Sequence, residues 1–127
     1  MPYYHVWFST KNRKWLLQGD VAAKAKELMT LISREKRIEL LECETMVDHV
    51  HLLLSADSPT ALSWSLKLLK GRSAFEVFRA FPDLKLDART NSLWQRSFNA
   101  RSVAPNQVPI VRRYIRTQDE RLEKYER

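Results

Sequence analysis

The segment that decides the fold reads His49-Val50-His51-Leu52-Leu53-Leu54, within a predicted strand over residues 46–55. Successive residues of a strand point to opposite faces of its sheet, so Val50, Leu52 and Leu54 share one face and both histidines lie on the other. The apolar face predicts a strand anchored in a core. The opposite face then presents His49 and His51 about 6–7 Å apart along the strand.

Elements on either side of this strand follow from the same periodicities. The predicted order is strand, helix, two strands, long helix, strand and final helix, over residues 3–10, 20–36, 38–45, 46–55, 58–81, 93–103 and 106–122. Asp20, Ser58 and Asn106 are the expected N-caps. Gly71 predicts a break or bend within the long helix, and residues 83–91 are expected to form a polar loop.

The order βαββαβ predicts an α+β, ferredoxin-like fold, with an antiparallel sheet, helices on one face and an additional C-terminal helix. That last helix carries Tyr114, and its expected core side chains are Val108, Val111, Ile115 and Leu122. Residues 1–127 are predicted to form one domain. Binding modules, phosphatase-like enzymes and nucleases share such a fold, so the fold alone does not determine function.

Composition excludes several classes of protein. The 127 residues are 44% hydrophobic and hold one cysteine, Cys43, which cannot form an internal disulfide and is expected in the core. No apolar run approaches the length of a membrane span, and the first residues lack the pattern of a secretory signal. We therefore expect a soluble, cytoplasmic protein without a membrane partner.

The positive charge is segregated along the chain. There are 22 lysines and arginines against 15 acids, giving +7, and residues 1–19, 58–75 and 88–118 contain no acid. Tryptophans and Phe98 are interleaved with these cations. Cations for phosphates and aromatic faces for unstacked bases indicate a binder of single-stranded nucleic acid, although a solvated basic face over core aromatics gives the same pattern.

Two motifs carry candidate chemistry. His49 and His51 can bind one divalent metal ion through neutral ring nitrogens, but two hydrogen-bonded surface histidines have the same spacing. Tyr114 and Gln118 are i, i+4 neighbours on the last helix and lie off its apolar stripe. A tyrosine among arginines is either a packing residue or, with a metal nearby, a nucleophile, and Gln118 would add a neutral oxygen ligand. Asp48 is expected to be a supporting or turn residue, and His5 a surface or sheet residue and not a ligand.

In their order and spacing, these motifs resemble the HUH single-tyrosine transposases of the insertion-sequence-200/605 type, including REP-associated tyrosine transposases. The resemblance covers nearly the whole chain and rests on Tyr4-His5-Val6-Trp7-Phe8 with Thr10-Lys11, Asp48-His49-Val50-His51-Leu52-Leu53, Leu69-Lys70-Gly71-Arg72-Ser73, Leu93-Trp94, and Arg113-Tyr114-Ile115 followed by Gln118. Val47 stands where the family usually has proline, and residues 96–103 depart from the family's Gly-, Tyr- and Thr-rich stretch.

The resemblance implies an enzyme that cuts and rejoins single-stranded DNA at hairpin-marked ends of a mobile element, without a nucleotide cofactor. Tyr114 would form a 5′-phosphotyrosine intermediate, and His49, His51 and Gln118 would hold Mg²⁺ or Mn²⁺. Family members are dimers, often with active sites shared between subunits. Charge placement adds a set of expected DNA contacts: Lys11, Arg13, Lys14, Lys67, Lys70, Arg72, Arg96, Arg112, Arg113 and Arg116.

Two alternatives remain from the sequence. One is a domesticated relative that processes chromosomal repeat hairpins with the same chemistry. The other is a non-catalytic nucleic-acid-binding domain of the same fold. Binding alone does not explain why a nucleophile and three metal ligands occur at the positions that the family uses for them.

Overall fold

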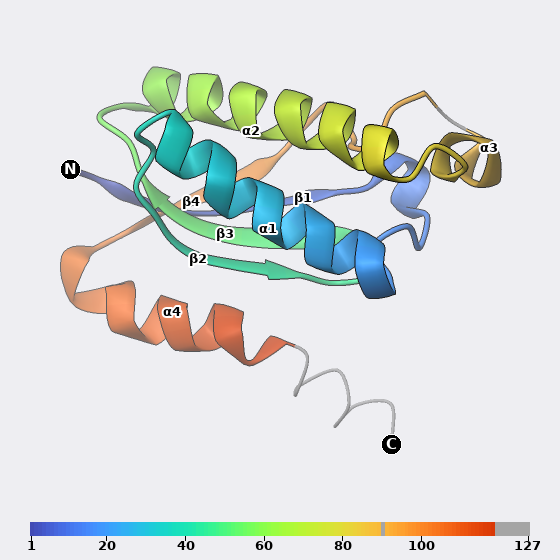
Figure 1. Cartoon of the computed structure of the whole chain (residues 1–127). Coiled ribbons are helices and arrows are strands. Elements are labelled where there is room, and N and C mark those ends of the chain that lie inside the picture. Colours follow the sequence, from blue (N-terminus) through green and yellow to red (C-terminus); the bar gives the residue numbers. More distant parts are fainter. Residues whose placement is uncertain (90, 119–127) are drawn as a thin grey trace.

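The computed structural model of the chain describes residues 1–89 and 91–118. A four-stranded antiparallel sheet forms its centre, in the order β2-β3-β1-β4 (Figure 1). Its strands are β1 (Tyr3–Ser9), β2 (Leu40–Thr45), β3 (His49–Ser55) and β4 (Asn99–Val103). β1 and β3 are the inner pair, so the first strand and the histidine-bearing strand lie side by side. The predicted α+β fold with an antiparallel sheet is confirmed.

Helices cover the two faces of the sheet unequally. α1 (Gly19–Glu35) and α2 (Pro59–Ala80) lie on one face, and α4 (Val108–Arg116) lies against the other (Figure 1). α3 (Leu84–Ala88) follows the end of α2. A short 3-10 turn, η1 (Lys11–Arg13), follows β1. A second one, η2 (Pro105–Gln107), precedes α4. Within the described ranges, no helix has both the length and the apolar composition that crossing a membrane requires.

The main core lies between the sheet and the α1–α2 layer. Its fully buried side chains include Val6 and Phe8 of β1 and Val50, Leu52 and Leu54 of β3, which confirms the alternation predicted for the histidine-bearing strand. A smaller cluster on the other face joins Leu53 to Val103 of β4 and Ile115 of α4. Cys43 belongs to the main core, and burial raises the pKa of its thiol to about 12, so the thiol stays protonated and unreactive.

Several predicted boundaries are corrected by the structure. Asp20 is not the N-cap of α1, because Gln18 occupies that position and Asp20 lies in the first turn. Its charge still favours the helix, since carboxylates near a helix N-terminus interact well with the free N–H groups. Ser58 is the predicted cap of α2, and its hydroxyl accepts a hydrogen bond from the Ala61 N–H at 3.1 Å.

The long helix has no break at Gly71, because α2 continues through it to Ala80. Buried residues on both sides of the glycine fasten the helix to the core, which outweighs the cost of about 1 kcal/mol for a glycine in a helix. As predicted, α2 ends just before Pro82, but the expected loop 83–91 contains the short helix α3.

The last strand and helix also differ from expectation. Only Asn99–Val103 pair as β4, and the earlier part of the predicted strand contributes an isolated bridge between Trp94 and Thr10. Asn106 lies within η2, so Gln107 precedes α4 without a side-chain cap. Leu122, predicted to face the core, lies outside the described residues.

Candidate active site

The two histidines of β3 lie on the α4 side of the sheet, as the strand period predicts. The ring centroids of His49 and His51 are 5.0 Å apart, and the rings are nearly perpendicular. Val50, between them, is completely buried on the opposite face. The pair therefore projects from a rigid inner strand, which limits the movement of both rings.

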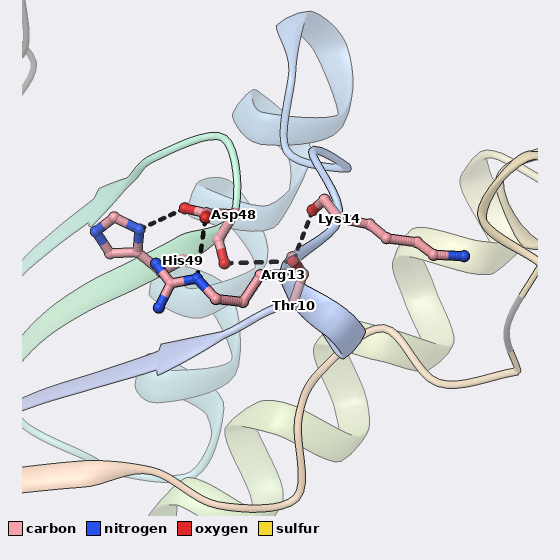
Figure 2. Close-up of polar contacts among 5 residues, drawn as sticks. All are labelled: Thr10, Arg13, Lys14, Asp48 and His49. Atoms are coloured by element: carbon pink, nitrogen blue, oxygen red, sulfur yellow. Dashed lines mark hydrogen bonds and ion pairs between the residues drawn. The ribbon is translucent and has the colours of Figure 1, made fainter.

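Asp48 holds the ring of His49. Its Oδ1 lies 2.7 Å from Nδ1 of His49, and its Oδ2 accepts a hydrogen bond from Nε of Arg13 at 3.2 Å (Figure 2). Burial alone would raise the pKa of Asp48, but the hydrogen bonds from His49 and Arg13 hold it below its usual value. A carboxylate can only accept, so it favours a proton on Nδ1 of His49 and leaves Nε2 with its lone pair.

Thr10 holds the backbone at Asp48 in place. Its hydroxyl oxygen is 2.7 Å from the carbonyl oxygen of Lys14 and 3.3 Å from that of Asp48 (Figure 2). The backbone N–H of Thr10 also donates to the Asp48 carbonyl, at 2.9 Å. The loop that begins with Thr10-Lys11 is thus fastened to the residue that orients His49.

His51 has a different partner, which the sequence did not identify. Nδ1 of His51 lies 3.0 Å from Nε2 of His5 on β1. Burial, with smaller contributions from His49 and His5, lowers the pKa of His51 to about 4, and burial and Arg101 lower the pKa of His5. Both rings are therefore neutral at pH 7, which is the form that binds metals. Finding His5 from the sequence would have required the register of β1 against β3.

Tyr114 projects from α4 toward these rings. Its ring centroid lies 5.9 Å from that of His5 and 6.3 Å from that of His51, both in edge-on geometry. The side chain is 37% exposed. A cavity of about 440 Å³ adjoins it, lined by His5, Trp7, His51, Arg101, Ile110, Val111 and Tyr114. The predicted nucleophile and one predicted metal ligand therefore border the same open cavity.

A carboxylate on β2 holds the tyrosine helix in place. Oε1 of Glu42 accepts hydrogen bonds from Nε of Arg112 at 3.1 Å and Nε of Arg116 at 2.6 Å. The apolar side of the helix is anchored by Ile115, which is fully buried. Arg112 and Arg116, both expected DNA contacts, thus pair within the chain, whereas Arg113 is exposed.

Gln118 lies one helical turn after Tyr114, as predicted. Its Nε2 donates to the carbonyl oxygen of Tyr114 at 3.2 Å, which leaves Oε1 as the amide's acceptor. Within residues 1–89 and 91–118, no hydrogen bond joins Gln118 to either histidine of β3.

The donors present fit a divalent ion only in part. Among the described residues, no group of three or more His, Cys, Asp and Glu side chains could hold a metal ion. His49 and His51 nevertheless provide two imidazoles on one face, each with Nδ1 engaged by a neighbour in the chain. An amide oxygen such as that of Gln118 is the type of donor that could complete such a set.

The remaining expected DNA contacts differ in their surroundings. Lys70 is half-buried, and its ammonium donates to the backbone carbonyls of Gln95, Arg96 and Ser97. Burial lowers the pKa of Lys70. Lys67, one turn earlier, is exposed, and its ammonium lies 5.6 Å from the ring centroid of Trp64.

The other basic side chains vary in the same way. Arg72 pairs with Glu35 at 3.2 Å, and Arg13 pairs with Asp48. Arg96 joins Lys67 and Lys70 around a second cavity of about 460 Å³ between α2 and residues 91–98. Lys11 and Lys14 belong to the loop after β1. The predicted cations therefore include both structural and accessible side chains.

Aromatic side chains divide similarly. Trp94 is a core residue, since it is 6% exposed and its indole N–H donates to the Ser73 hydroxyl at 2.9 Å. Trp15 and Trp64 are 70% and 63% exposed. These two rings, and not Trp94, are available for stacking on a base.

Comparison with known proteins identifies the family. Residues 2–118 match the family described as "Transposase IS200 like". The chain belongs to this family. The matched range includes β1, the histidine pair and the tyrosine helix of this transposase.

Relatives of known identity support the same assignment. The IS200-like transposase is 36% identical over 118 residues to the ISDra2 transposase TnpA of Deinococcus radiodurans, covering 93% of this chain and 84% of that protein. It is 29% identical over 107 residues to the transposase for insertion sequence element IS200 of Salmonella typhimurium, covering 84% and 70% of the two chains.

Solved structures show the same fold. A crystal structure described as that of a transposase from Deinococcus radiodurans R1 has a TM-score of 0.74 and 34% identity, covering 93% of this chain and 92% of that chain. A structure of a REP-associated tyrosine transposase bound to a REP hairpin has a TM-score of 0.64, and the match covers 94% of this chain and 67% of that chain. Its identity is 11%, so that likeness concerns the fold alone.

Proposed function

We propose that this IS200-like transposase is a metal-dependent enzyme that nicks and rejoins single-stranded DNA through a 5′-phosphotyrosine intermediate. One observation carries the proposal: the ring of Tyr114 lies 6.3 Å from that of His51, beside an open cavity, in a chain of this family. A packing tyrosine would be expected against apolar side chains. Tyr114 borders two imidazoles as well as apolar side chains, and the adjoining cavity, with Arg101 in its wall, leaves space beside the phenol.

In the proposed reaction, the phenolic oxygen of Tyr114 attacks a backbone phosphorus. The bond from phosphorus to the 3′ oxygen breaks, and the new bond joins phosphorus to the tyrosine. The phenol releases its proton, and the departing oxygen takes one up to become a free 3′-OH. A 3′-OH then attacks the adduct, which restores a phosphodiester and frees the tyrosine.

His49, His51 and Gln118 are the residues that would hold Mg²⁺ or Mn²⁺. When bound, such an ion polarises the scissile phosphate and stabilises the charge that develops on it. The chain's own contribution is to orient the donors: Asp48 engages Nδ1 of His49, and the buried inner strand keeps both rings on one face. No nucleotide cofactor takes part.

The proposed substrate is single-stranded DNA with a hairpin near the cut. The REP-associated neighbour of the same fold is bound to a REP hairpin, and the present chain offers accessible cations with exposed Trp15 and Trp64. Lys67, Arg96 and Arg113 are suited to contact phosphates. Arg13, Arg72, Arg112 and Arg116 are paired within the chain and would first have to exchange a carboxylate for a phosphate.

We further propose a homodimer. Mixing the inactive variants His49→Ala and Tyr114→Phe tests how its active sites are built. Sites formed within one chain give no recovery of cleavage, because each chain of the mixture lacks one essential residue. Sites shared between chains regain one complete set and recover part of the activity.

The test of the proposed function is a cleavage assay. Purified protein is mixed with labelled single strands from both flanks of its gene, with Mn²⁺ or with EDTA. We expect a nick and a covalent protein–DNA band in Mn²⁺, and neither in EDTA. Cleavage that persists in EDTA would contradict the metal role. Tight hairpin binding with no cleavage of any strand would favour the non-catalytic binding domain instead.

A further inference from the structure

We propose that His5 is a positioning residue that orients His51 and sets its tautomer for metal binding. This inference rests on the proposed function and extends it to a residue on a different strand. His5 and His51 are each 8% exposed, and Nε2 of His5 lies 3.0 Å from Nδ1 of His51. Two buried neutral imidazoles at this distance share one proton in a hydrogen bond.

The direction of that hydrogen bond decides whether His51 can bind a metal. If Nδ1 of His51 donates, its Nε2 keeps a lone pair and faces outward as a ligand. If Nε2 of His5 donates instead, the single proton of His51 sits on Nε2, which then has no lone pair for a metal. Metal binding by His51 therefore requires His5 to be the acceptor.

The arrangement matches that of the other histidine. Nδ1 of His49 is engaged by the carboxylate of Asp48, and Nδ1 of His51 is engaged by the imidazole of His5. Metal-binding histidines usually donate their second ring N–H to a neighbouring acceptor, which fixes both tautomer and ring orientation. With both Nδ1 atoms engaged, the two Nε2 atoms are the nitrogens left for one ion.

Packing holds His5 where it can do this. Its ring stacks on that of His51 with centroids 5.2 Å apart, and it also contacts Trp7 at 5.0 Å. In the sheet, His5 lies opposite Leu53 on β3 and Arg101 on β4, so it is the diagonal neighbour of His51. The β-sheet register alone brings the two rings together.

The first test measures Mn²⁺ affinity without DNA. His5→Phe keeps an aromatic ring but has no acceptor, and we expect its Mn²⁺ dissociation constant to rise about 10–100-fold. His5→Gln places an amide oxygen near the original Nε2 position and should restore affinity to within a few-fold of the wild type. Tyr3→Phe, two residues away on the same face of β1, is the matched control and should bind Mn²⁺ normally.

The second test reads the tautomer of His51 in the metal-free protein by ¹⁵N NMR of the imidazole rings. We expect the proton of His51 on Nδ1 in the wild type and in His5→Gln, and a shift toward Nε2 in His5→Phe. A wild-type His51 protonated on Nε2 would overturn the proposal. Thermal melting of each metal-free variant reports any loss of folding separately.

These outcomes distinguish the two proposals. If neither the wild type nor any variant binds Mn²⁺, the proposed metal site fails and the role of His5 fails with it. If the wild type binds Mn²⁺ and His49→Ala does not, the metal site stands. Unchanged Mn²⁺ affinity in His5→Phe would then overturn the role of His5 alone.

Discussion

The two faces of the central strands β1 and β3 differ in what covers them. On one face, Val6, Phe8 and Leu52 are at most 1% exposed beneath α1 and α2. On the other, α4 is the helix that lies across the sheet among residues 1–89 and 91–118, and an open cavity remains beside His51 and Tyr114. The same backbone therefore supports a close-packed core and an accessible polar site.

Because strand side chains alternate, the two faces cannot be chosen independently. A shift of one residue in the pairing of β1 with β3 would move the histidines into the core and the apolar side chains outward. Because burying the histidines and exposing the apolar side chains costs free energy, only one register is stable. That register places His5 diagonally next to His51. Core packing on one face thus positions the reactive groups on the other.

The largest expected effect comes from the open face. Tyr114→Phe should lower DNA cleavage on the order of 10⁴-fold or more, as removing a nucleophile does. Hairpin affinity and melting temperature should stay near the wild-type values, because only one hydroxyl is lost. Tyr3→Phe is the matched control. Gel-based cleavage and binding assays measure both quantities, and wild-type cutting by Tyr114→Phe would remove the tyrosine from the mechanism.

The next effect comes from the covered face. Leu52→Ala deletes a fully buried side chain and should lower the free energy of unfolding by about 2–5 kcal/mol. His49→Gln, on the open face of the same strand, should change it by less than about 1 kcal/mol. Urea denaturation of both variants checks the contrast. Equal losses would mean that the two faces contribute alike to stability.

A smaller effect separates two neighbouring lysines on α2. Lys70→Met removes the donor for three backbone carbonyls and should cost about 1–3 kcal/mol of unfolding free energy. Lys67→Met, one turn away and exposed, is the control and should leave stability unchanged. Thermal or urea denaturation of both variants measures the difference in stability. A Lys70→Met protein as stable as the control would contradict the structural role.

The smallest effect concerns DNA affinity. Lys67→Met should weaken binding of all single strands by a similar factor and reduce the salt dependence of binding by about 0.7 in log–log slope. Lys70→Met should leave that slope nearly unchanged, since its ammonium is already engaged within the chain. Titrations at several salt concentrations measure the slope. A larger change in slope for Lys70→Met than for Lys67→Met would mean that Lys70, and not Lys67, contacts the DNA phosphates.

Period and spacing were sufficient to predict much of this molecule. Alternation in residues 46–55 predicted that Val50, Leu52 and Leu54 enter the core and that His49 and His51 share the opposite face. The i, i+4 relation predicted that Tyr114 and Gln118 share a helix face, away from Val111 and Ile115. These relations are local, so they do not depend on how distant segments pair.

The sequence could not predict the relations that depend on pairing. The contact between His5 and His51 joins residues 46 positions apart and requires the strand register. The engagement of Lys70 with carbonyls of residues 95–97 and of two arginines with Glu42 likewise arises from packing between distant elements. Charge placement alone therefore indicated DNA contacts where several cations have partners in the chain.

The most direct test of the account is to ask which end of a cleaved strand stays on the protein. A single-stranded hairpin substrate is labelled at its 5′ end in one reaction and at its 3′ end in another, with Mn²⁺ in both. A 5′-phosphotyrosine predicts that the 3′-labelled part migrates with the protein, linked through the Tyr114 peptide in mass spectrometry. It also predicts that the 5′-labelled part is released with a free 3′-OH. Cleavage without any linked strand, or a link at another residue, would contradict the central claim.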